Sequence, residues 1–187
     1  QWLRYGIALE ANQQNSVLVY APGQPTRLLM KDNDAARIAL PQLRAQLPEI
    51  DTLGPLHDAR IAVDDAQALA QMFCTIVLQL DLQAVLEGLA EWQPALRAPL
   101  YAQLQAQLAQ TLAQLDAERI DTAPARRLLA APPLPVKYLL SAGSLLSKQH
   151  TGARDINKFY GDSAPNPFGA AFADTDDAAL HRQVAQR

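Results

Sequence analysis

Residues 64–92 read DDAQALAQMFCTIVLQLDLQAVLEGLAEW and contain the most informative pattern in the chain. Asp64 and Asp65 suit the start of a helix, because aspartate caps a first turn and favours the positive end of the helix dipole. Polar residues then recur at every fourth position, and almost everything between them is apolar. Each step of four turns by about 40°, so the polar stripe winds around the helix. We therefore expect a long helix, or two helices that meet in a bend near Asp81, enclosed by protein on most sides.

A second helix is predicted for residues 98–115, a window that contains no charged residue. Its leucines fall on one face, its alanines on another, and its glutamines form a thin stripe between them. The Leu face is expected to enter the core, whereas the small residues of the Ala face let another helix approach closely. That helix belongs either to the same chain or to a partner. The partner-binding candidates on this face are Ala102, Ala106, Ala109 and Ala113.

The first thirty residues favour short strands. Larger apolar residues alternate from Leu3 to Leu9, and residues 16–20 and 27–30 are rich in β-branched and other apolar residues. Such a small sheet is not stable alone, so helices have to cover it. The predicted fold class is α+β: a small N-terminal antiparallel sheet of two to four strands, packed on a mainly helical body.

The last part of the chain loses all periodicity. We predict a single α+β domain over residues 1–150 and an irregular C-terminal extension, or arm, over residues 151–187. Glycines and prolines interrupt this arm, yet its aromatic residues are costly to leave in water. The arm is therefore expected either to pack on its own domain or to insert into a partner. Its candidate anchors are Phe159, Tyr160, Phe168 and Phe172.

Composition limits the kinds of partner. The formal net charge is −3 and only 19% of the 187 residues are charged, which argues against binding to nucleic acid. Arg outnumbers Lys by 12 to 4, which favours a GC-rich bacterial source. The most apolar window, residues 72–80, is too short for a transmembrane span. The sequence starts at Gln1 and does not decide whether a signal peptide or a membrane anchor precedes it. Three locations are compatible with it: the bacterial cytoplasm, the periplasm, and tethering at the inner membrane.

The sequence contains few candidate catalytic or metal-binding residues. The three histidines, His57, His150 and His181, are too far apart in sequence for a helical metal pair, and the single Cys74 lies in an apolar run that predicts burial. No glycine-rich phosphate loop follows a strand. We therefore predict no catalytic residues, no cofactor and no metal site.

These observations favour a non-catalytic bacterial interaction module, such as an adaptor or an assembly component beside a membrane. Its partner would be a protein, either another copy or a different chain. One alternative is a small hydrolase whose site assembles from distant residues such as Ser144, Lys148 and His150. Another alternative is an immunity or inhibitor protein. A cleft that gathers His, Ser and acidic groups would favour the enzyme, and a flat Ala-lined face would favour the adaptor.

Overall fold

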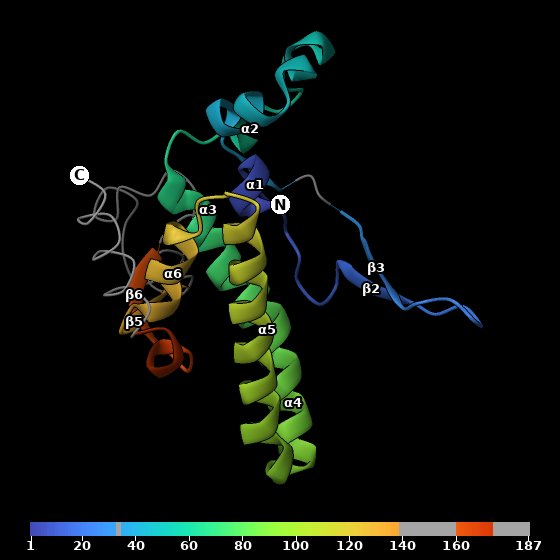
Figure 1. Ribbon diagram of the computed structural model, residues 1–187, viewed down its shortest axis with the longest axis vertical. Coiled ribbons are helices and arrows are strands. Elements are labelled where there is room, and N and C mark those ends of the chain that lie inside the picture. Colours follow the sequence, from blue (N-terminus) through green and yellow to red (C-terminus); the bar gives the residue numbers. More distant parts are fainter. Residues whose placement is uncertain (33–34, 139–159, 174–187) are drawn as a thin grey trace. The chain divides into compact units, whose positions relative to one another are not determined.

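The computed structural model describes residues 1–32, 35–138 and 160–173 (Figure 1). The chain divides into two compact units, residues 1–125 and residues 126–187. Short antiparallel strands near the N-terminus accompany a mainly helical body, so the predicted α+β fold class is confirmed. The predicted domain boundary near residue 150 lies outside the described residues and stays a prediction.

The first residues form a helical turn instead of the expected strand. α1 (Trp2–Tyr5) ends at Gly6, whose φ of 68° is left-handed and whose N–H donates to the Trp2 carbonyl at 2.8 Å. The strand that follows, β1 (Ile7–Ala8), is only two residues long and pairs antiparallel with β4 (Arg37–Ile38). Alternating apolar residues also fit one turn of helix followed by a short strand, which explains the wrong prediction for residues 3–5.

The second and third predicted strands are confirmed. β2 (Ser16–Val19) and β3 (Arg27–Met30) form an antiparallel hairpin, drawn in blue in Figure 1, with Val17 opposite Leu29 and Leu18 opposite Leu28. This hairpin is a sheet of its own, separate from the β1–β4 pair, so the strands do not form the single small sheet that was expected. Further along the chain, Ala62 forms an isolated parallel bridge with Ile38.

Short helices connect this part to the main helix. They are α2 (Leu40–Gln46), η1 (Pro48–Leu53) and η2 (Ala59–Ile61), the last two being 3-10 helices. Leu43 of α2 is buried, and Gln42 of the same helix donates its Nε2 hydrogen to the Leu3 carbonyl at 2.8 Å. This contact holds α2 against α1.

One continuous helix runs from Ala66 to Trp92, as the sequence predicted. It consists of α3 (Ala66–Met72), the π-helix η3 (Phe73–Gln83) and α4 (Ala84–Trp92). The Asp65 side chain accepts a hydrogen bond from the Gln67 N–H at 2.8 Å, so the predicted cap is confirmed. The π register takes the place of the predicted bend. The Trp2 ring packs on Phe73 with 5.0 Å between centroids.

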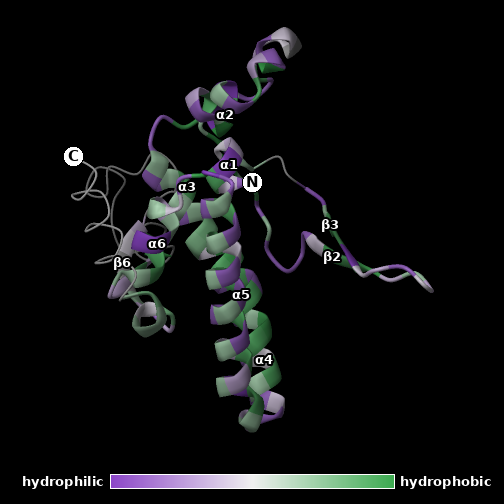
Figure 2. Cartoon of the chain, in the orientation of Figure 1, coloured by the Kyte–Doolittle hydropathy of each residue, from purple (hydrophilic) through white to green (hydrophobic). Residues whose placement is uncertain are grey.

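The expectation that this helix is enclosed on most sides is wrong. Leu80 is 53% exposed and Trp92 is 80% exposed, and Val85 and Leu89 are exposed as well. Figure 2 shows the apolar colouring along α4. By length and composition this helix could cross a membrane, because its mean hydropathy is 1.6 over 18 residues. This finding corrects the prediction that the most apolar part of the chain is too short for a transmembrane span. The core helix of a soluble protein passes the same test, so these two properties alone do not establish a span.

α5 (Arg97–Ala117) follows the 3-10 helix η4 (Pro94–Leu96) and runs back along α4 (Figure 1). Its bounds agree closely with the predicted window. Leu112 is buried, and the other leucines of the same face are half-buried. This face therefore packs inward as predicted, and the helix pair brings the start of α5 beside the end of α4.

α6 (Ala123–Ala130) runs across the boundary between the units and is followed by β5 (Pro133–Lys137). β5 pairs antiparallel with β6 (Tyr160–Pro165), so this proline-rich segment is a strand. Asn166 then donates to the carbonyls of Leu129 and Ala131 at 2.8 and 2.6 Å. These bonds tie the end of β6 to the end of α6.

Candidate functional site

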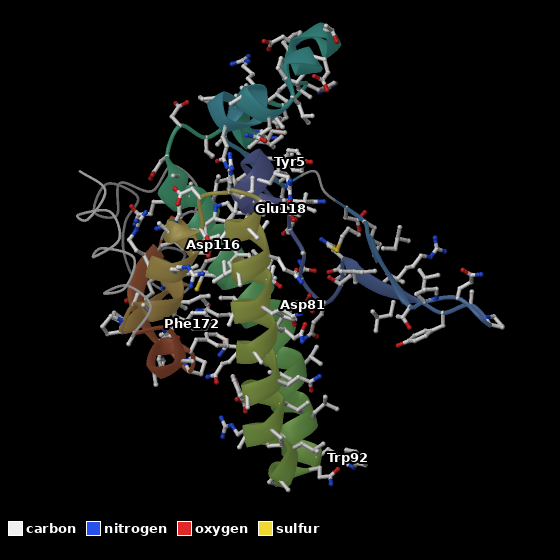
Figure 3. The ribbon with its side chains drawn as sticks, viewed as in Figure 1. Tyr5, Asp81, Trp92, Asp116, Glu118 and Phe172 are labelled. Atoms are coloured by element: carbon white, nitrogen blue, oxygen red, sulfur yellow. The ribbon has the colours of Figure 1, made fainter. Side chains whose placement is uncertain are left out.

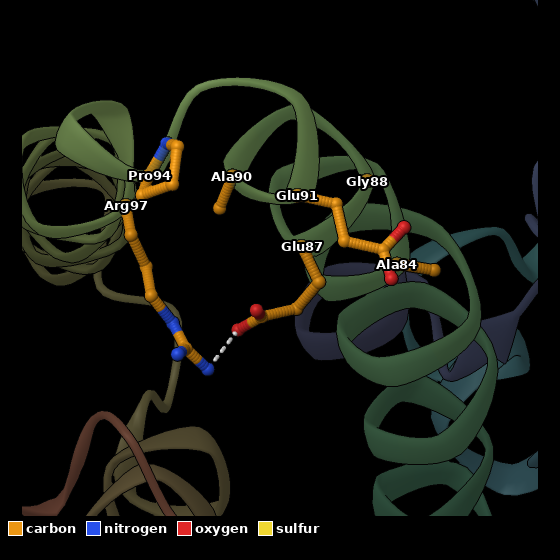
Figure 4. Close-up of a pocket in the computed structure, with 7 residues that line it drawn as sticks. All are labelled: Ala84, Glu87, Gly88, Ala90, Glu91, Pro94 and Arg97. Atoms are coloured by element: carbon orange, nitrogen blue, oxygen red, sulfur yellow. Dashed lines mark hydrogen bonds and ion pairs between the residues drawn. The ribbon is translucent and has the colours of Figure 1, made fainter.

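A hollow lies where α4 and α5 meet. Its volume is about 560 Å³, within the range of roughly 300–1,000 Å³ typical of small-molecule clefts. Figure 4 shows its lining, which is Ala84, Glu87, Gly88, Ala90, Glu91, Pro94 and Arg97.

Glu87 is the most connected side chain in this hollow. Its Oε1 accepts hydrogen bonds from Arg97 Nη2 and from the Tyr101 hydroxyl, both at 2.8 Å. Gln83 Nε2 also donates to the Tyr101 hydroxyl, at 3.4 Å. The hydrogen bond from Tyr101, and then the one from Arg97, lower the pKa of Glu87 below its usual value. Glu87 is therefore held ionised at neutral pH, and its position is fixed by two donors from α5.

Glu91 lies one helical turn after Glu87 and on the same side of α4, since residues four apart are neighbours on a helix surface. It is exposed, and the structure gives it no hydrogen-bond or ion-pair partner among the described residues. The hollow thus holds two carboxylates and one guanidinium, and within the part of the chain that the structure describes the Glu91 carboxylate has no compensating charge. Such an arrangement favours a cationic ligand.

A second polar contact joins the π-helix to the hairpin. Ser16 Oγ, at the base of β2, donates to Asp81 Oδ2 at 3.2 Å. Burial raises the pKa of Asp81, and the hydrogen bond from Ser16 partly offsets this effect. Figure 3 labels Asp81 along the helix. Because π segments are frequent at functional sites, this contact is a second candidate for a role beyond packing.

The predicted partner-binding residues have different surroundings. The four alanines of α5, Ala102, Ala106, Ala109 and Ala113, are all exposed. Tyr160 is half-buried in β6, whereas the Phe168 and Phe172 rings are buried within the chain. Phe159 lies outside the described residues. A partner at any of these positions stays a prediction.

The residues of the alternative hydrolase, Ser144, Lys148 and His150, also lie outside the described residues. The structure therefore does not place them relative to one another. Cys74 is buried as predicted, and Gln79 Nε2 donates to its Sγ at 3.6 Å.

The protein family described as ferric iron reductase FhuF-like transporter matches residues 2–153. The chain belongs to this FhuF-like family. The matched region contains the hollow, the π-helix and the hairpin. No individual curated protein matches the sequence significantly.

Membership of the FhuF-like family corrects the predicted function. A family described as a ferric iron reductase indicates iron chemistry, so the prediction of a non-catalytic protein-binding adaptor is wrong. Reduction of an iron substrate by an electron donor needs neither a nucleophile nor a general base, so motifs of those kinds do not reveal it. The residues in and beside the hollow that the sequence did not single out are Glu87, Glu91, Arg97 and Tyr101. Their signal was a pair of glutamates four apart in a helix otherwise nearly free of charge.

A resident iron–sulfur carrier does not fit the donor set of these 187 residues. Such clusters take four cysteine thiolates, or two thiolates and two histidines, and the FhuF-like chain has one cysteine. Across the described residues there is also no group of three or more His, Cys, Asp or Glu side chains arranged to hold a metal ion. The ligands of a cluster would therefore not all come from this stretch of chain, and the chemistry below is assigned to a donor from outside it.

Proposed function

We propose that this FhuF-like chain takes part in the reduction of ferric iron to ferrous iron. The observation that carries the proposal is the match of the ferric iron reductase FhuF-like family to residues 2–153. The ferric ion is the substrate, and the carboxylates of the protein take it from a small carrier complex, such as ferric citrate, by ligand exchange. The protein supplies the surface on which that substrate meets an electron donor.

The donor in this proposal is an external reductant, for which reduced flavin is the test reagent. One dihydroflavin gives one electron to each of two ferric ions, which leaves oxidised flavin, two ferrous ions and two protons. The electrons therefore balance, and no covalent bond forms between iron, flavin and protein. What the chain contributes is binding and orientation, which is the usual share of the protein in such chemistry.

The hollow between α4 and α5 is the proposed docking place for the ferric species. Carboxylate oxygens suit hard cations, and Glu91 offers one that no side chain of the described residues neutralises. Arg97 and Tyr101 hold the neighbouring Glu87 carboxylate ionised and in place. Attraction to these carboxylates falls when the ion changes from Fe³⁺ to Fe²⁺, because the Coulomb energy scales with the charge. Reduction therefore favours release of the product.

An anaerobic assay of ferrous iron tests this function. The full chain is mixed with ferric citrate and photoreduced flavin, and a coloured Fe²⁺ chelator reports the product. We expect the chain to raise the initial rate of Fe²⁺ formation clearly above that of the protein-free mixture. Equal rates with and without the chain would rule out the proposed activity.

Glu91→Gln tests the place of binding. Loss of the free carboxylate should raise the ferric concentration at half-maximal rate several-fold, with a smaller effect on the maximal rate. Asp64→Asn is the matched control, because Asp64 is also an exposed carboxylate but does not line the hollow. If the two variants behave alike, the hollow is not the docking place, even where the wild-type chain is active.

A further inference from the structure

The exposed large apolar side chains of the described residues gather on two elements. One element is the β2–β3 hairpin and the other is the helix segment from Leu80 to Trp92. These side chains are Val17, Leu18, Tyr20, Leu28 and Leu29 on the hairpin, and Leu80, Val85, Leu89 and Trp92 on the helix. Contiguous exposed apolar surface of this kind marks an interaction site.

The hairpin has apolar residues on both of its faces. Val17 faces Leu29 across the strands on one face, and Leu18 faces Leu28 on the other, because successive side chains of a strand alternate. Neither strand pairs with a third strand among the described residues. A lone hairpin is marginal in water, and its open edges favour pairing with another chain. The hairpin therefore needs a cover on each face.

The two exposed elements have opposite charges. Between residues 11 and 31 the only charged side chains are Arg27 and Lys31, which are both basic. Between residues 66 and 92 the only charged side chains are Asp81, Glu87 and Glu91, which are all acidic. The acidic helix would be repelled by an anionic lipid surface, whereas it complements the hairpin in both charge and apolar character. Each element is thus a suitable cover for the other.

We propose that this chain forms a two-fold homodimer in which the β2–β3 hairpin of each copy packs on the exposed side of η3 and α4 of the other copy. The chain's own helix could cover only one face of its hairpin. In a two-fold dimer the second face also finds a cover, because the two hairpins meet around the axis. Such an isologous contact uses the same surface of both copies, which is the commonest symmetry of soluble oligomers.

The hollow would stay accessible in this dimer. Val85, Leu89 and Trp92 point about 100° around α4 from Ala84, Gly88 and Glu91, since each residue of an α-helix turns by about 100°. The docked hairpin therefore borders the hollow without filling it. The dimer proposal is in this way independent of the proposed iron reduction, and each can fail without the other.

Light scattering after size-exclusion chromatography tests the dimer with the full chain at about 1–100 μM, a range that covers micromolar association. The wild-type chain should have twice the mass of one copy at the upper end. Leu18→Glu and Leu89→Glu, both at exposed positions, should give monomers with unchanged helical circular dichroism. Ala106→Glu, on the exposed face of α5, is the control that should remain dimeric. A wild-type monomer throughout, or a dimer that both hairpin and helix variants leave intact, overturns the proposal.

Cross-linking between copies shows whether the hairpin reaches its own helix or another one. Leu28→Cys chains carrying a mass tag are mixed with untagged Leu89→Cys chains and oxidised, while the buried Cys74 stays protected. A disulfide-linked product of mixed mass is expected. Absence of that product overturns the proposal. The proposal is also overturned if a double variant, with Leu28→Cys and Leu89→Cys in one chain, forms an intramolecular disulfide in preference to linked dimers.

Discussion

Gly6 ends the first helix in a backbone conformation that other residues rarely adopt. Its φ is +68°, and a Cβ at this position would meet Gln42 Cβ at 3.0 Å and the Ala39 carbonyl oxygen at 3.1 Å. We expect Gly6→Ala to lower the free energy of unfolding in urea by about 1–2 kcal/mol from the left-handed conformation alone. Gly88→Ala is the matched control, because Gly88 lies in α4 with nothing within 4 Å of an added Cβ. Gly88→Ala should raise the free energy of unfolding by about 0.5–1 kcal/mol, because alanine favours the helix more than glycine does. A similar decrease in the free energy of unfolding in both variants would contradict this account.

Asp81 gives a pH dependence whose sign can be worked out. Burial raises its pKa above the ordinary value of 3.8, so the folded state binds the proton more tightly than the unfolded state. Stability contributed by this group therefore falls as pH rises from about 3.8 through the folded pKa. Asp81→Asn, which can still accept from Ser16, should melt at a higher temperature than wild type at pH 7. This difference in melting temperature should vanish near pH 3. A wild-type melting temperature that rises relative to that of the variant as pH increases would contradict the burial argument.

Leu69 and Leu80 show how one helix differs along its length. Leu69 of α3 is 1% exposed, whereas Leu80 of the π segment is 53% exposed. Leu69→Ala should lower the free energy of unfolding by about 2–5 kcal/mol, as in other large-to-small core changes. Leu80→Ala, measured on dilute monomer, should change it by about 0.5 kcal/mol or less. Comparable losses in urea unfolding would show that the exposed side of the helix is covered within one chain.

The predicted helices were correct where local signals decide. Asp65 supplies a cap, and the periodic pattern extends to Trp92, so both ends of the long helix follow from the sequence. The π-helix could not be predicted, because a change of hydrogen-bond register leaves no trace in composition. β5 was missed for a different reason: Pro133 and Pro135 favour a connector locally, and only the distant strand β6 makes this segment part of a sheet.

The candidate site could be predicted only in part. Glu87 and Glu91 are visible as a pair in sequence, but Arg97 and Tyr101 join them only because η4 turns the chain back on itself. The expected enclosure of the long helix failed because burial depends on which elements exist to cover it. The prediction of an adaptor failed because the reduction named in the family's description requires no nucleophile or base that a sequence motif would reveal.

At the scale of the whole molecule, the most direct test of iron reduction measures the oxidation of the electron donor. Photoreduced flavin is mixed anaerobically in a stopped-flow instrument with the full chain and either Fe³⁺ citrate or Ga³⁺ citrate, since Ga³⁺ has the same charge but accepts no electron under these conditions. We predict that the chain accelerates flavin oxidation by Fe³⁺, that Ga³⁺ causes none, and that added Ga³⁺ slows the Fe³⁺ reaction by competing for the hollow. Flavin traces with Fe³⁺ that are identical in the presence and absence of the chain would contradict the account.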